Sequence, residues 1–185
     1  MEDNSMDYLQ HQFERFFVEN GASSWWITGL KSTLMITVIA LAIGVVLGFT
    51  VGIIRSTYEQ TGKFKVLNAI TKVYLSIIRG TPSMVQLLIF NFIIFAAVTL
   101  DEIIVGGIAF GINSGAYVAE IVRSGIMSID KGQTEAGRSL GLSAGQTMKL
   151  IIIPQAFKNV LPALINEMIV LLKETAIIGY IGTTD

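Results

Sequence analysis

The sequence predicts an all-α, polytopic membrane protein, and two observations support this fold class. Of the 185 residues, 52% are hydrophobic and only 15% are charged. The apolar residues stand in long uncharged blocks, and polar, glycine-containing stretches separate these blocks. The net charge of −1 gives no argument for nucleic acid as a partner. The absence of cysteine excludes disulfides, thiol catalysis and cysteine-ligated metals.

The N-terminal segment, residues 1–23, is expected to lie outside the membrane or at its interface. Its first ten residues carry acids and no basic residue, which is the wrong sign for a secretory signal. Residues 6–19 are expected to form an interfacial helix, with a disordered tail as the alternative. His11 has no second histidine nearby, so we interpret it as a solvated surface residue. The apolar residues that share one side of the helix are Tyr8, Leu9, Phe13, Phe16 and Phe17.

The first membrane span is predicted over residues 32–54, an uncharged run long enough to cross a bilayer with some tilt. Trp25 and Trp26 precede it, where indole rings favour the headgroup layer. Small residues recur at every fourth position, which favours close packing against a neighbouring helix. These residues are Ala40, Gly44, Gly48 and Gly52.

The second span follows a basic loop at residues 55–72. Apolar sequence runs from about Val66 to Leu100, and the helix is expected to be kinked or restarted near Pro82. Proline cannot donate a backbone hydrogen bond, and it disfavours helix in the residue before it. A short acidic turn at residues 101–102 ends this segment.

The third and fourth spans are predicted over residues 103–121 and 155–172, the fourth interrupted by Pro162. Glu120 is expected at the cytoplasmic headgroups or in a wet cavity, because a charge that faces lipid costs several kcal/mol. The third span carries a second ridge of small residues at every fourth position, namely Gly107, Gly111, Gly115 and Ala119.

The basic residues predict the orientation of the spans. Ten of the thirteen fall on the side that holds the 55–72 loop and the polar segment of residues 123–154. The positive-inside rule therefore places the N-terminus outside the cell membrane and the polar segment in the cytoplasm. The ten residues are Arg55, Lys63, Lys65, Lys72, Arg79, Arg123, Lys131, Arg138, Lys149 and Lys158.

Residues 123–154, here called the polar island, are predicted to fold as a helix, a glycine hinge and a second helix. Asp130 or a nearby residue can cap a short helix that reaches Leu140. Glu135 and Arg138 are three residues apart and can pair on its surface.

Gly141 is expected to end the first island helix, because glycine adopts the left-handed conformation without a side-chain clash. Leu142 can then fold back on the apolar face. Ser143 and Gln146 have the spacing of a capping box for the second helix, which meets Pro154.

The polar island resembles the EAA loop of bacterial ABC importer permeases. Their pattern is Glu-Ala-Ala, three residues, Gly, nine residues, Ile, one residue and Leu-Pro, and the spacing here matches throughout. Gly137 replaces an Ala and Ile153 replaces a Leu, and both keep the small or aliphatic character. The matching residues are Glu135, Ala136, Gly137, Gly141, Ile151, Ile153 and Pro154.

Flanking motifs are similar to those of the polar amino acid subfamily. The resemblance covers residues from about 25 to 180 and implies a permease domain over residues 24–185. It also implies the helical bundle of type I ABC importers, which normally has five spans. Four are visible here, and we expect the fifth to be missing beyond the point where the sequence stops. The motifs include Arg79-Gly80-Thr81-Pro82, Asn113-Ser114-Gly115, Pro154-Gln155-Ala156 and Asn166-Glu167.

The resemblance implies a machine of several chains. Permeases of this family pair with a second permease, identical or a sister chain, and bind two ATP-binding cassette subunits, while a binding protein delivers amino acid from outside. The chain has no GxxxxGK[ST] loop, so we expect no enzymatic activity or cofactor on it, with ATP and Mg on the partner. The resemblance assigns coupling to the ATPase to Glu135, Ala136, Gly137, Arg138, Ser139, Leu140, Gly141 and Leu142.

A zwitterionic amino acid needs an anion for its ammonium group and donors for its carboxylate. Glu167, with Asn166 beside it, is the strongest candidate, because an acid in an apolar run must face a cavity or a partner. It either contacts substrate or pairs with another helix. Gln86, Asn113 and Ser114 either face the substrate pathway or join helices.

A channel or secondary transporter without an ATPase partner is the alternative function, and a membrane scaffold is another. The sequence shows no chain of titratable groups within the spans and no evident inverted repeat. An ATP-binding partner held through the polar island would decide for the importer.

Overall fold

The structure is a computed structural model that describes residues 3–15 and 22–181. Within these residues the chain is helical and contains no strand, so the predicted all-α fold class is confirmed. Helix α1 (Asp3–Glu14) lies apart from the rest of the molecule, and Tyr8, Leu9 and Phe13 on it are exposed. Phe16 and Phe17, which belong to the predicted interfacial stripe, lie outside the described residues.

In the part of the chain that the structure describes, two single helices are long and apolar enough to cross a membrane, and a bent pair of helices over residues 65–94 passes the same test when it is taken as one span. The two single helices are Ser23–Thr61, within α2 (Ala22–Thr61), and α5 (Glu102–Met127). Both contain a span predicted from the sequence. Helix α8 (Ile153–Glu174) has 22 residues but is less apolar, so the fourth span stays a prediction. Pro162 lies inside α8, which continues through it, and the predicted interruption at this residue is wrong.

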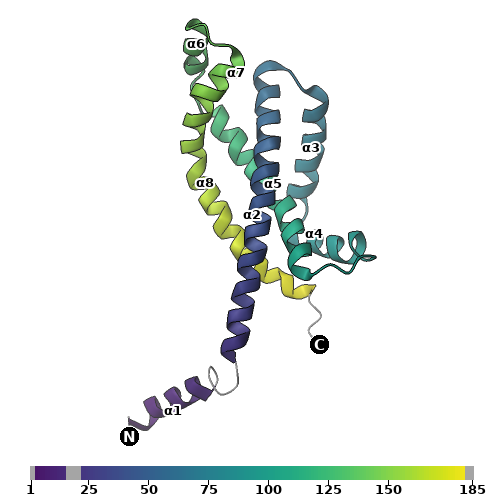
Figure 1. The fold of residues 1–185 in the computed structure, drawn as a ribbon, viewed down its shortest axis with the longest axis vertical. Coiled ribbons are helices and arrows are strands. Elements are labelled where there is room, and N and C mark those ends of the chain that lie inside the picture. Colours follow the sequence, from purple (N-terminus) through teal and green to yellow (C-terminus); the bar gives the residue numbers. More distant parts are fainter. Residues whose placement is uncertain (1–2, 16–21, 182–185) are drawn as a thin grey trace.

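The second predicted span is broken into two helical parts. Helix α3 (Lys65–Gly80) is followed by α4 (Ser83–Ile89) and the π-helical η2 (Phe90–Ile94). The two parts bend by 106° at the break, so the restart expected near Pro82 is confirmed. Figure 1 shows α4 turning away from the axis that α3 follows beside α2.

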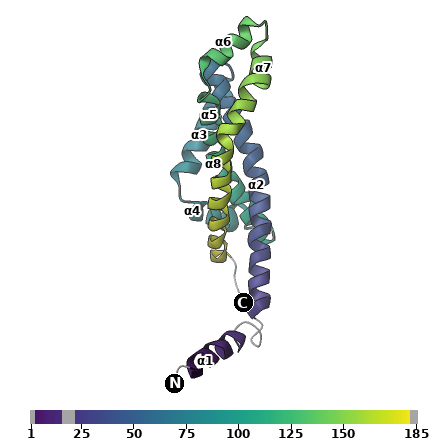
Figure 2. The ribbon, with the colours of Figure 1, turned by 90° about the vertical axis from the view of Figure 1, so that its left-hand side faces the viewer.

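The two ridges of small residues bring α2 and α5 together. The helices run side by side in the same direction (Figures 1 and 2). A Cβ atom added at Gly52 would lie 2.8 Å from the carbonyl oxygen of Ala119, and one at Gly111 would lie 2.7 Å from Cβ of Ile43. Side chains at these positions would force the helices apart, which confirms the close packing predicted for both ridges.

Helix α8 crosses α5 near Gly125, where an added Cβ would clash with Val160. This crossing buries Val122 and Ile126 of α5 against Val160 of α8 and against Ile152, the last residue of the π-helical η3 (Met148–Ile152). The short 3₁₀ helix η4 (Thr175–Tyr180) follows α8.

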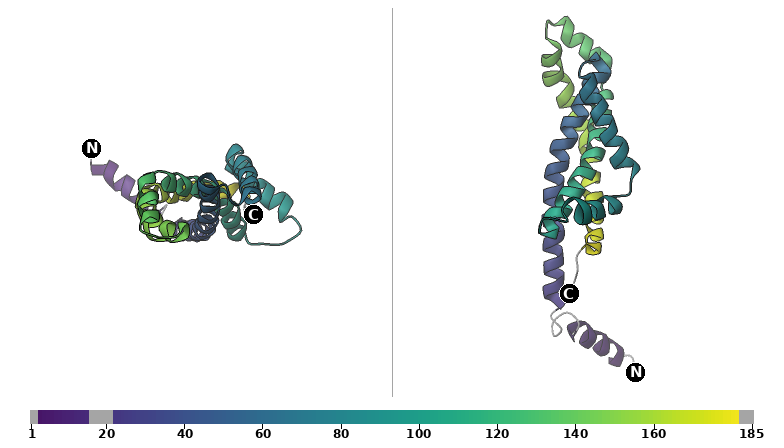
Figure 3. Two further views of the ribbon diagram at one scale, coloured as in Figure 1. Left: turned by 90° about the horizontal axis from the view of Figure 1, so that it is seen from above. Right: turned by 90° about the vertical axis from the view of Figure 1, so that its right-hand side faces the viewer.

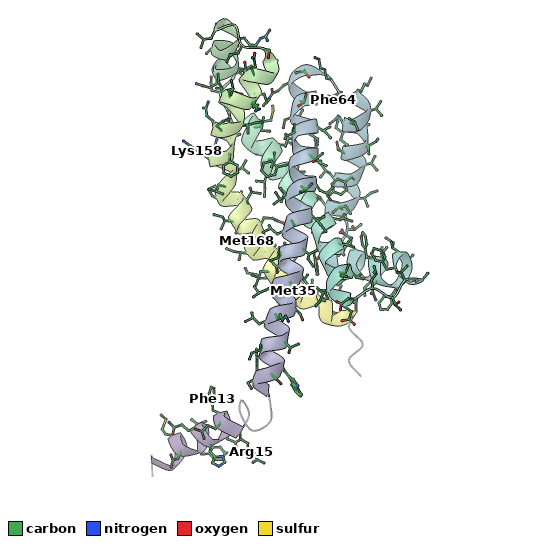
Figure 4. The ribbon with its side chains drawn as sticks, viewed as in Figure 1. Phe13, Arg15, Met35, Phe64, Lys158 and Met168 are labelled. Atoms are coloured by element: carbon green, nitrogen blue, oxygen red, sulfur yellow. The ribbon has the colours of Figure 1, made fainter. Side chains whose placement is uncertain are left out.

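The polar island and the turn between α2 and α3 lie at the same end of the molecule, and α1 lies at the other end (Figures 1 and 3). Phe64, in the α2–α3 turn, is labelled at this end in Figure 4. The two segments that the basic residues assign to one side of the membrane are therefore neighbours in space.

Candidate functional site

The first helix of the polar island is α6 (Lys131–Ser139). Asp130 caps it, since its Oδ1 accepts a 2.7 Å hydrogen bond from the amide of Gly132. This confirms the predicted cap. Arg138 Nη1 donates to the carbonyl of Leu142 at 3.2 Å. Among the described residues it forms no ion pair with Glu135, so the predicted surface pair is wrong.

Gly141 ends α6 in the left-handed conformation, with φ of +83°. The amide of Leu142 donates to the carbonyl of Gly137 at 3.1 Å, and the amide of Gly141 donates to the carbonyl of Arg138 at 3.0 Å. These two bonds form a Schellman motif, which satisfies carbonyls that the helix end leaves without partners. The predicted glycine stop is confirmed, and the hydrogen bonds define the angle between the island helices.

The second island helix, α7 (Ala144–Thr147), begins with the predicted capping box. Ser143 Oγ accepts from the amide of Gln146 at 3.3 Å, and Gln146 Oε1 accepts from the amide of Ser143 at 2.8 Å. Helix α7 continues through the π-helical η3 (Met148–Ile152) into α8. Pro154 in the first turn of α8 has no amide hydrogen, which explains the irregular hydrogen bonding just before it.

The island helices touch at Gly137, which is buried. A Cβ at this position would lie 2.6 Å from Cγ2 of Thr147. Gly137 stands where the EAA pattern has Ala, and it lies at a close contact between α6 and α7, the helix that leads into α8. On the outer side, Glu135, Ala136, Arg138 and Ser139 are exposed, and Leu140 is 81% exposed.

Gln86 and Asn113 form a buried pair that stabilises the break between α3 and α4. Gln86 Nε2 donates to the carbonyl of Ile78 at 2.7 Å and to Oγ1 of Thr81 at 2.7 Å. Its Oε1 accepts from Nδ2 of Asn113 at 2.9 Å. Both side chains are less than 7% exposed. Of the two roles expected for these residues, the geometry favours the joining of helices.

Ser114, the next residue on α5, points to a different neighbour. Its Oγ donates a 2.9 Å hydrogen bond to Oε1 of Glu167 on α8. Ser114 is 1% exposed, and Glu167 is partly buried. Asn166 is exposed on α8 and takes no part in this contact. The structure thus separates the five candidate pathway residues into two pairs and an exposed amide.

An ion network links α2, α3 and α5, and its centre is Glu120. The Glu120 carboxylate lies 2.6 Å from Arg55, 2.9 Å from Arg123 and 3.7 Å from Arg79. Glu59 lies 3.2 Å from Arg123 and 3.6 Å from Arg55. This network was not predicted from the sequence. Two of its pairs could have been found from their spacing in the sequence. Arg55 and Glu59 are four residues apart, and Glu120 and Arg123 are three apart, so each pair lies on one helix face.

Comparisons with known proteins identify the family of this chain. Residues 44–185 match the family described as "Binding-protein-dependent transport system inner membrane component". The arginine transport system permease protein ArtQ of Bacillus subtilis is 40% identical, over 86% of this chain and 71% of that protein. The glutamine transport system permease protein GlnP of Escherichia coli is 38% identical, over 86% of this chain and 72% of that protein.

Solved structures show the same fold. One is the crystal structure of an amino acid ABC transporter with histidines, whose matching chain is 42% identical in sequence. The match covers 92% of this chain and 78% of that chain, with a TM-score of 0.79. The MetNI methionine ABC transporter, at 21% identity, covers 86% of this chain and 76% of its own, with a TM-score of 0.71, and supports the fold alone. The family match covers most of the chain. The chain therefore belongs to the family of inner membrane components of binding-protein-dependent transport systems.

Proposed function

We propose that this chain is the permease of an ABC importer for a polar amino acid and that the polar island couples it to an ATPase. The observation that carries the proposal is the exposed, doubly capped island, whose second helix continues without a break into α8. The relatives named above transport arginine or glutamine, and the similar crystal structure contains histidines. Arginine, glutamine and histidine share an α-ammonium and an α-carboxylate group.

The proposed partners are two ATPase subunits, which hold ATP and Mg, a second permease and an external substrate-binding protein. The exposed outer side of α6, with Glu135, Arg138 and Leu140, offers the ATPase two charges and one large apolar side chain. The proposed orientation has the N-terminus outside and the island in the cytoplasm, because most basic residues fall on the island's side.

The proposed movement passes from α6 to α8. Nucleotide-driven closure of the ATPases would displace α6, and the Schellman motif at Gly141 transmits the displacement to α7 without a change of angle. Helix α8 then moves relative to α5, which it contacts at Gly125 and through the bond from Ser114 to Glu167. ATP binding thus shifts the population between outward-facing and inward-facing states.

For the substrate we propose Glu167 as the anion that receives the ammonium group. Ser114 donates to one of its oxygens, and the other oxygen, which has no hydrogen-bond partner within residues 3–15 and 22–181, can accept a further hydrogen bond. Asn166 is a proposed second contact, since it is exposed on the adjacent position of α8. Gln86 and Asn113 contribute indirectly, because they hold the α3–α4 break.

Replacement of residues 131–145 by a flexible linker tests the coupling. The membrane complex should lose its ATPase subunits during purification, and ATP hydrolysis should no longer respond to loaded binding protein. The matched control replaces residues 3–14, at the opposite end of the molecule, and should retain the ATPase. Equal retention of the ATPase by both variants would contradict the proposed role of the polar island.

A further inference from the structure

A basic cavity of about 590 Å³ lies between α2, α3 and α5, and three residues of the ion network line one side of it. Three basic side chains and a single carboxylate line it. Lys72, Ser76 and Arg79 recur on one side of α3, and they are exposed, so the cavity opens to the surface of the bundle. The polar and aromatic side chains that line it are Arg55, Lys72, Ser76, Arg79, Tyr117 and Glu120.

The positive charge of the cavity is not balanced by the residues around it. Glu120 is already shared by three arginines. Lys72 forms no ion pair with any carboxylate in the described part of the chain. Arg79 comes no closer to Glu120 than 3.7 Å, so this ion pair is the longest of the three at Glu120. The Arg79 side chain lies over the ring of Tyr117 and is 43% exposed. The Lys72 ammonium and the Arg79 guanidinium therefore have donors available for an anion.

The apolar surroundings of the cavity indicate the source of that anion. On the same turns of α3, Val73 and Ile77 are 58% and 57% exposed. Arg55 is the first charge after the uncharged residues 32–54 of α2, so the cavity lies where the apolar part of the bundle ends. A phosphate at this level with hydrocarbon beside it is the arrangement of a phospholipid at the membrane interface.

We propose that this cavity binds the headgroup phosphate of an anionic phospholipid in the cytoplasmic leaflet. Lys72 and Arg79 contact the phosphate, the Ser76 hydroxyl donates a further hydrogen bond, and an acyl chain lies along Val73 and Ile77. This assignment rests on the proposed orientation of the permease. A bound lipid would add negative charge beside Glu120 and stabilise the contact of α3 with α2 and α5.

Native mass spectrometry of the assembled transporter, titrated with phosphatidylglycerol or phosphatidylcholine, tests the proposal. The wild type should bind phosphatidylglycerol more tightly than phosphatidylcholine. Lys72→Gln should weaken phosphatidylglycerol binding about fivefold, as expected when one basic residue near an anionic headgroup is lost. Ser76→Asp should abolish the preference, because it places a carboxylate in the cavity. The matched control, Lys158→Gln, removes an exposed lysine from α8, on the other side of the bundle (Figure 4). This variant should bind phosphatidylglycerol as tightly as the wild type does.

Three outcomes would overturn the proposal. One is an equal loss of binding in Lys72→Gln and Lys158→Gln, and another is no preference for phosphatidylglycerol in the wild type. The third is displacement of the lipid by inorganic phosphate alone, which would identify a site for a soluble anion. Thermal unfolding of each variant checks that the bundle is intact. Lipid binding is measured without transport, so a negative result would leave the proposed importer function standing.

Discussion

Ser114 on α5 and Glu167 on α8 are joined by a hydrogen bond of 2.9 Å, and this bond lies between the two helices that the proposed coupling movement displaces relative to each other. Because Ser114 is almost fully buried, its hydroxyl has few alternative partners. Glu167 is only partly buried, and its second oxygen has no hydrogen-bond partner among the described residues. The same carboxylate can thus serve both helix packing and the proposed recognition of an ammonium group.

Glu167→Gln keeps an acceptor for Ser114 and removes the negative charge. We expect uptake of the transported amino acid at low concentration to fall about tenfold or more, because a hydrogen bond to a charged group contributes about 1.5–3 kcal/mol. Uptake by reconstituted vesicles, measured with a panel of amino acids, checks this. Glu102→Gln, which neutralises an exposed acid at the start of α5, is the control. Identical uptake parameters for Glu167→Gln and wild type would show that the carboxylate only joins the helices.

Gly141→Ala tests the rigid turn between α6 and α7. A side chain in the left-handed conformation costs about 1–2 kcal/mol, so α6 should change its angle to α7 or fray. Gly141→Pro should have a larger effect, since proline requires a negative φ and removes the amide that donates to Arg138. Substrate-stimulated ATP hydrolysis should fall in both variants while membrane insertion is retained. Gly145→Ala, in the neighbouring helix where an added Cβ meets nothing within 4 Å, should behave like wild type.

Glu120→Gln tests the ion network. The substitution leaves three arginines without their shared carboxylate, and we expect the free energy of unfolding to fall by about 1–3 kcal/mol. Arg79→Gln removes the most distant and most exposed partner and should cost less. Thermal unfolding in detergent measures both variants. If Arg79→Gln were the more destabilising, Glu120 would not be the centre of the network.

Gly48→Val tests the contact between α2 and α5. An added Cβ at Gly48 clashes with Val118, and a valine should destabilise the bundle by about 1–3 kcal/mol through overpacking. Gly29→Val introduces the same side chain on the same helix, where nothing lies within 4 Å, and is the matched control. The unfolding midpoints of the two variants check this expectation. Equal midpoints for Gly48→Val and Gly29→Val would show that α2 and α5 can move apart without loss of stability.

Local features of the polar island were predictable because each depends on residues close together in the chain. Asp130 caps the helix that begins one residue later, and Ser143 and Gln146 satisfy one another within a single turn. The restart at Pro82 is also local, since it follows from a missing backbone donor. The expected pair of Glu135 and Arg138 failed because the Arg138 side chain reaches a carbonyl beyond the helix end.

The roles of the polar residues within the bundle depended on contacts between distant segments. Gln86 and Ser114 both stood in apolar sequence, and either could face a pathway or a neighbouring helix. Their partners lie 27 and 53 residues away along the chain, on helices whose rotation no local pattern predicts. The ion network is similar, since Arg55 and Glu120 are separated by 65 residues.

Hydropathy, helical period and capping act within a few turns, so the helical membrane class, the ridges of small residues and the caps of the polar island follow from the amino-acid sequence alone. The contacts between distant helices follow from the packing of the whole bundle. Packing brings the two ridges face to face, pairs Gln86 with Asn113 and Ser114 with Glu167, and places three arginines around Glu120. Buried polar and charged groups need partners, and only the arrangement of the helices selects which partner lies within reach.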